Sequence, residues 1–69
     1  MSKTAAAIAA HRAYVRALTV GAAAYTAFDV ACAAYRASWP GLDDGELRNT
    51  VAEALATLGR EQAGNTDAV

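Results

Sequence analysis

The sequence has almost none of the residues that cross-link small proteins or hold metals. It contains one cysteine, Cys32, and one histidine, His11, in 69 residues. One cysteine excludes an internal disulfide, and one histidine with one cysteine argue against a protein-only metal site. A lone unpaired cysteine also suits a reducing compartment, so we expect a cytoplasmic protein without cofactors.

The residue patterns of catalysis are missing as well. The sequence has no glycine-rich phosphate loop and no pair of cysteines at metal-binding spacing. His11 has no acid or second histidine near it on a helix. Cys32 falls in the middle of a predicted helix, where neither a base nor a helix N-terminus would activate it. Asp43 and Asp44 are explained by helix capping, so we expect no enzymatic activity.

Charge is unevenly distributed along the chain. No acidic residue precedes Asp29, whereas three basic residues do: Lys3, Arg12 and Arg16. From Asp43 onward, six acids stand against two arginines, although the net charge is only −1. The most apolar stretch, residues 17–35, includes Asp29, which would cost about 2.5–3.5 kcal/mol near a bilayer centre. We therefore expect no membrane span.

Alanine is what the sequence has in abundance. Twenty residues are alanine, and fifteen of them lie between Ala5 and Ala37. Alanine is the strongest helix former, and its small side chain lets two helices approach closely. The first half of the chain therefore predicts one long helix, over about residues 4–38, that lies against another helix.

The ends of this helix carry recognisable signals. Ser2 or Thr4 can cap its first turn, and Pro40 stops it because proline lacks an N–H. Gly21 is its one glycine and would cost about 1 kcal/mol in a helix interior. The sequence leaves open whether the helix is continuous or broken at Gly21.

Apolar residues recur every seven positions within this predicted helix. A seven-residue repeat favours packing against another helix in a left-handed supercoil. A shorter second helix cannot reach the first part of this face, and a chain of this size draws little stability from its own core. We therefore predict a homodimer. Its predicted interface consists of Ile8, Val15, Leu18, Ala22, Tyr25, Asp29 and Cys32. Asp29 would need a partner there, and Arg36 is the cation within one heptad.

A second helix is expected over about residues 43–60. Asp43 and Glu46 have the spacing of a capping box, and the leucines on either side have the spacing of a hydrophobic staple. The capping residues are Leu42, Asp43, Glu46 and Leu47.

Two further expectations concern this half of the chain. Asp44 and Arg48 are four residues apart, in the order that favours an ion pair within one helix. Residues 63–69 show no pattern and are expected to be a disordered tail beyond a single domain of residues 1–62.

Two sets of side chains are candidates for binding a partner. Arg12 and Arg16 lie one helical turn apart beside Tyr14, and can pair with an acidic segment of a sister subunit or of another protein. Aromatic residues left exposed would serve as binding anchors, although most are expected in the core. The candidate residues are Arg12, Tyr14, Arg16, Phe28, Tyr35 and Trp39.

Together these patterns predict an all-α helical hairpin that dimerises into a four-helix arrangement. The expected function is non-catalytic binding to another protein. By analogy of size alone, we expect the protein to act as an inhibitor or accessory factor of the kind that phages or mobile elements carry. Its expected source is bacterial or phage. The alternatives are a nucleic-acid-associated regulator using Lys3–Arg16, which the charge balance argues against, and a structural subunit of a helical assembly.

Overall fold

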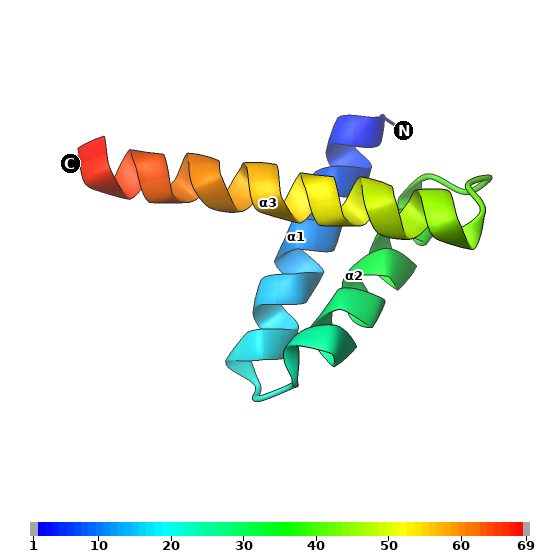
Figure 1. The fold of residues 1–69 in the computed structure, drawn as a ribbon, viewed down its shortest axis with the longest axis horizontal. Helices are drawn as coiled ribbons and strands as arrows, with labels where there is room; N and C mark the ends of the chain where they lie inside the picture. Colours follow the sequence, from blue (N-terminus) through cyan, green and yellow to red (C-terminus); the bar gives the residue numbers. More distant parts are fainter. Residues whose placement is uncertain (1, 69) are drawn as a thin grey trace.

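Three helices form the part of the protein that the structure describes. The structure is a computed structural model that describes the backbone of residues 2–68 and the side chains of residues 2–60. The helices are α1 (Lys3–Thr19), α2 (Ala24–Ser38) and α3 (Asp44–Ala68). α1 and α2 form an antiparallel hairpin, and α3 crosses the open end of that hairpin (Figure 1). The predicted all-α class is confirmed.

The single long helix predicted over residues 4–38 is wrong, because the chain turns at Gly21. Gly21 has a φ of +96°, in the left-handed region that glycine adopts without a steric penalty. Its N–H donates to the carbonyl of Leu18, and the N–H of Ala22 donates to the carbonyl of Ala17, both at 3.0 Å. This pair of bonds is a Schellman motif, which satisfies the last carbonyls of α1. The predicted two-helix hairpin is therefore a three-helix fold, and its long heptad face is divided between α1 and α2.

Alanine packs α1 against α2. Ala6 and Ala10 of α1 and Ala27 and Ala31 of α2 are all fully buried. Within each pair the residues are four apart, so they lie on one face of their helix. Because alanine projects only a methyl group, the two backbones can lie close together along this face.

The small core lies where all three helices meet. Tyr35 and Val51 are its large fully buried side chains. Cys32 is 7% exposed and Leu47 is 5% exposed, and both belong to the same cluster. The prediction that Cys32 is buried is confirmed. α3 therefore contributes Leu47 and Val51 to a surface that α1 and α2 have already built from alanine.

The predicted start of α3 is confirmed. The N–H of Glu46 donates to the Asp43 carboxylate at 2.8 Å, and the N–H of Leu47 donates to the Asp43 carbonyl at 2.8 Å. Asp43 is thus the N-cap. Leu42 is half-buried against the core beside the buried Leu47, as the predicted staple requires. Ser2 likewise caps α1 by accepting a hydrogen bond from the N–H of Ala5 at 3.1 Å.

α3 continues further than expected. It runs to Ala68, past the end predicted at about residue 60. The predicted tail over residues 63–69 lies outside the residues whose side chains the structure describes, so its disorder stays a prediction. Within the described chain, none of the helices combines the length and apolarity needed to cross a membrane.

Candidate interaction surfaces

An apolar stripe on α1 is left uncovered by the rest of the chain. Ile8, Val15 and Leu18 are 40%, 45% and 41% exposed. At 3.6 residues per turn, Ile8 and Val15 lie opposite the buried alanines of α1, and Leu18 lies to one side of them. Ile8 also borders α3, across a groove that Thr50 and Ala54 help to line. Breaking the long helix at Gly21 therefore does not hide these residues.

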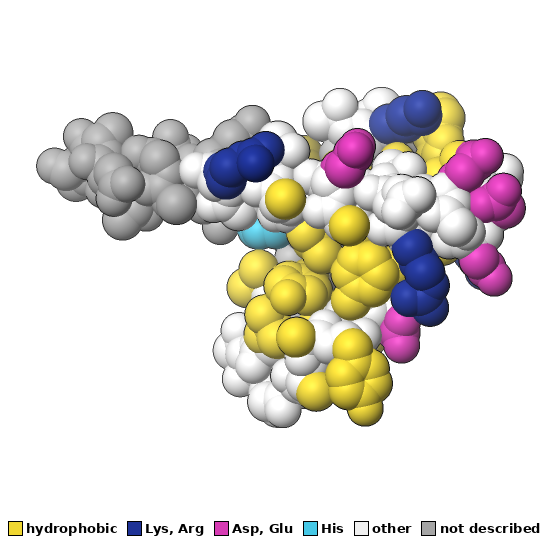
Figure 2. All heavy atoms as spheres, viewed as in Figure 1, with side chains coloured by type: hydrophobic (Ala, Val, Ile, Leu, Met, Phe, Trp, Pro, Cys, Tyr) yellow, Lys and Arg dark blue, Asp and Glu magenta, His cyan; other side chains and the backbone are white. Residues whose placement is uncertain are grey.

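Further large apolar side chains are exposed around the turn and on α2. Val20 and Tyr25 flank the Gly21 turn and are 79% and 77% exposed, and Val30 of α2 is 43% exposed. Figure 2 shows hydrophobic side chains gathered over the part of the hairpin that α3 leaves open. Exposed apolar area concentrated on one part of a small protein is typical of an interaction surface.

The structure divides the predicted dimer interface. Ile8, Val15, Leu18, Tyr25 and Asp29 are exposed, and Ala22 is half-buried at the turn. Cys32 is the exception, because the cluster that buries it consists of side chains from α1, α2 and α3 of the same chain. Its assignment to an interface between two copies is corrected to the core of one copy.

The aromatic candidates are mostly occupied inside the chain. Tyr35 is 1% exposed and is a core residue. Tyr14, Phe28 and Trp39 are half-buried and pack against the core. The Lys3 ammonium lies 5.8 Å from the ring centroid of Trp39, a cation–π contact that ties α1 to the end of α2. Tyr35 is therefore not accessible to a partner, whereas the side chains of Tyr14, Phe28 and Trp39 are partly accessible.

The predicted basic pair is exposed on α1. Arg12 and Arg16 line a shallow groove of about 420 Å³ together with Val15 and Val20. His11 and Thr19 complete its lining. The groove thus combines apolar side chains with two guanidinium groups, a composition that suits an amphipathic acidic segment.

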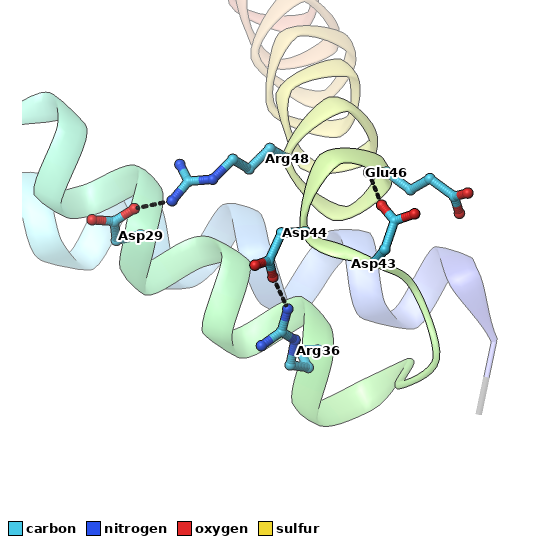
Figure 3. A network of polar contacts seen from close by, with 6 residues as sticks. All are labelled: Asp29, Arg36, Asp43, Asp44, Glu46 and Arg48. Atoms are coloured by element: carbon cyan, nitrogen blue, oxygen red, sulfur yellow. Dashed lines mark hydrogen bonds and ion pairs between the residues drawn. The ribbon is translucent and has the colours of Figure 1, made fainter.

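Two ion pairs between α2 and α3 were not predicted from the sequence. The Arg36 guanidinium lies 2.5 Å from the Asp44 carboxylate, and the Arg48 guanidinium lies 3.4 Å from the Asp29 carboxylate (Figure 3). The expected pairing of Asp44 with Arg48 within one helix is therefore wrong. The pairing of Asp29 with Arg36, expected in a dimer interface, stays a prediction. Within one copy, each residue pairs across the two helices, because α3 crosses α2 and brings opposite charges together.

These ion pairs border a groove with Cys32 among its lining residues. The groove has a volume of about 430 Å³, and Cys32, Ala33 and Leu47 are among the residues that line it. Burial raises the pKa of the Cys32 thiol, an effect partly offset by Arg48. A raised pKa favours the protonated thiol, which is a poorer nucleophile and a poorer metal ligand than the thiolate.

The described residues hold no cluster of three or more histidine, cysteine, aspartate or glutamate side chains able to bind a metal ion. Comparisons with known proteins found no match: no family model, no curated protein and no solved structure matches this chain. Its function must therefore be argued from its own surfaces.

Proposed function

We propose that this protein is a small, non-catalytic protein–protein interaction module that forms a homodimer. The observation that supports the proposal best is the exposed stripe of Ile8, Val15 and Leu18 on α1, each of them at least 40% exposed. Burying a fully exposed side chain of this size contributes roughly 1.5–3 kcal/mol, so covering the remaining two-fifths of each would contribute about 0.6–1.3 kcal/mol. A chain whose large fully buried side chains are Tyr35 and Val51 has much to gain from that burial.

A two-fold dimer suits this surface. In an isologous interface the same patch is used by both copies, so one apolar stripe is sufficient to cover its counterpart. Two α1–α2 hairpins that meet through α1 would form a four-helix arrangement, with each α3 on the outside. Because Val15 belongs both to the stripe and to the Arg12–Arg16 groove, such a dimer would cover part of that groove, and the exposed guanidinium groups would remain for a second, acidic protein. Binding of this kind involves no chemistry, so the module would act stoichiometrically, as an inhibitor or accessory factor.

The test compares two charge insertions at sites of equal exposure. Leu18→Glu places a carboxylate in the stripe, and Val30→Glu places one on α2, outside the stripe. These positions are 41% and 43% exposed, so neither substitution buries a charge within one copy. Molar mass is measured by light scattering at tens of micromolar, with helix content measured by circular dichroism.

We expect a dimer for the wild-type protein and for Val30→Glu, and a folded monomer for Leu18→Glu. A wild-type monomer at this concentration would contradict the homodimer. A Leu18→Glu variant that remains dimeric would place the interface elsewhere. Pull-down with the wild type and with the monomeric variant then shows whether capture of a further protein depends on the dimer.

A further inference from the structure

The end of the α1–α2 hairpin is an uncharged, apolar tip formed by residues 19–25 around the Gly21 turn. Figure 1 shows this turn at the end of the hairpin farthest from α3. Val20 and Tyr25 are 79% and 77% exposed, the most exposed of the large apolar side chains that the structure describes. In the sequence, no charged residue lies between Arg16 and Asp29. The tip therefore presents two large apolar side chains to solvent with no charge among them.

Most polar groups of the turn are already paired inside the chain. The N–H groups of Val20, Gly21 and Ala22 donate to carbonyls of α1 at distances of 3.0 to 3.2 Å. The Thr19 hydroxyl donates to the Val15 carbonyl at 2.8 Å. Unpaired polar groups are costly in hydrocarbon, so this pairing lowers the cost of moving the turn out of water. α2 begins without a side-chain cap, so the N–H groups of its first turn still need water or lipid headgroups. The tip is therefore suited to the headgroup boundary of a bilayer and not to its centre.

Two basic residues lie directly behind the tip. Arg16 and Arg12 are exposed and come one and two turns before Val20, about 6 and 12 Å back along α1. Apolar groups at a membrane surface sink roughly 5–10 Å into the boundary between headgroups and acyl chains. With the tip at that depth, Arg16 would lie among the lipid phosphates, and the long side chain of Arg12 could extend to them. Tyrosine is also typical of this boundary, as Tyr25 would be.

The acidic residues are kept away from the tip. Asp29 is the acid nearest to it in the sequence and lies 3.4 Å from the Arg48 guanidinium. The next acid, Asp43, follows the far end of α2, a helix of 15 residues and about 22 Å in length. That distance exceeds two Debye lengths of about 8 Å at physiological ionic strength. The acids of α3 would therefore hardly oppose the approach of the tip to an anionic surface.

We propose that the tip binds an anionic lipid surface, with Val20 and Tyr25 in the headgroup boundary and Arg12 and Arg16 at the lipid phosphates. A protruding end suits a flat bilayer, whereas a protein would need a cavity to receive it. This is attachment to the surface and not a membrane span. The tip is formed within one copy, so the inference does not rest on the proposed homodimer. The same arginines face the acidic protein of the proposed function, so lipid and that protein would compete for them.

Sedimentation with vesicles tests the proposal. The wild-type protein is mixed with vesicles of phosphatidylcholine, with or without phosphatidylserine, at low and at physiological ionic strength. We expect binding to the vesicles that contain phosphatidylserine, and weaker binding at the higher ionic strength. If these vesicles bind no protein even at low ionic strength, or if both kinds of vesicle bind it equally, the proposal is overturned. Neither result would change the molar mass that tests the homodimer.

Two double variants separate the apolar and the basic contributions. Val20→Ser with Tyr25→Ser should weaken binding at least about tenfold, because both apolar anchors are lost. Arg12→Gln with Arg16→Gln should weaken it about 25-fold, because each arginine near an anionic surface contributes about a fivefold gain. Wild-type binding by either double variant would overturn the proposal.

Matched controls change exposed residues outside the tip. Val30→Ser removes an exposed valine of α2, and Arg60→Gln removes an exposed arginine of α3. Both should bind the vesicles like the wild type. Losses in these controls as large as those in the double variants would contradict a site at the tip.

Fluorescence reports which end of the hairpin meets the lipid. Trp39 is the only tryptophan of the chain and follows the last residue of α2, at the end opposite the tip. Its emission should not shift when vesicles with phosphatidylserine are added. Tyr25→Trp combined with Trp39→Phe moves the reporter to the tip, where the emission should shift to the blue. A shift for Trp39 without one at position 25 would overturn the proposal, and this measurement does not depend on the folding of the serine and glutamine variants.

Discussion

Arg48 ties α3 to α2 by two contacts at once. Its guanidinium lies 3.4 Å from the Asp29 carboxylate and 5.9 Å from the ring centroid of Phe28. The side chains of Arg48 and Asp29 are 60% and 58% exposed, so water and salt weaken their attraction. This pair therefore contributes more to where α3 crosses the hairpin than to how firmly it is held there.

The N-cap of α3 should contribute measurably to stability. Asp43→Ala removes the acceptor of the Glu46 N–H bond, and loss of such a cap costs about 0.5–2 kcal/mol. Urea titration measures the free energy of unfolding. Asp43→Asn keeps an acceptor at this position and should lose much less. Equal losses for the two variants would contradict the capping role.

Two glycine-to-alanine substitutions should have opposite effects. At Gly21 the positive φ disfavours a Cβ, so Gly21→Ala should destabilise the fold by about 1–2 kcal/mol. At Gly59, inside α3, nothing lies within 4 Å of an added Cβ, and Gly59→Ala should stabilise by about 0.5–1 kcal/mol. Thermal melting distinguishes the two signs. A stabilising Gly21→Ala would mean that the chain can remain helical through the turn.

Cys32 should react slowly in the folded protein. Burial shields the thiol and raises its pKa, so a thiol reagent should modify it much faster after unfolding. The pKa also predicts a trend in stability. As the pH rises past the ordinary thiol value of 9.0, the unfolded chain releases the proton first, so the stability should fall. The stability of the Cys32→Ala variant should fall less steeply over this pH range, because the variant has no thiol to titrate. Equal reaction rates in the two states would place Cys32 at the surface.

Arg12→Glu combined with Arg16→Glu tests the basic groove. If these arginines pair with acids of a sister subunit, the double variant should lower the dimer mass measured by light scattering. If they contact another protein, the fold and the dimer should persist while pull-down of that protein is lost. Arg60→Glu serves as a charge-reversal control on α3. If the double variant matches the wild type in all these measurements, the arginines contact only solvent in these assays and the groove is not a protein-binding site.

Local signals predicted the beginnings of helices well. The Asp43 cap, the Leu42–Leu47 staple and the Ser2 cap depend on residues within a few positions of one another, and the structure has all three. The burial of Cys32 followed from its spacing from other apolar residues. Such features need no knowledge of how the helices are arranged.

Features that depend on the arrangement of helices were not predicted. Gly21 was identified as the place for a break, but seven-residue spacing across it favoured continuity, because the same spacing recurs in α1 and in α2. The ion pairs join residues 8 and 19 positions apart, and nothing local distinguishes them from an Asp44–Arg48 pair within α3. One local signal did indicate the break. Gly21 follows the last residues of α1 directly, and a glycine just beyond the C-cap is a common way for a helix to end.

The alanine face between α1 and α2 also has a consequence for how the chain folds. Its contacts join segments linked by a short turn, and alanine has no side-chain rotamers to order as they form. We therefore expect the α1–α2 hairpin to fold early and quickly. α3 can dock only after that, because Leu47 and Val51 pack against the surface that the hairpin forms. α3 would then be the last helix to join the fold, although it supplies Val51, one of the large fully buried side chains.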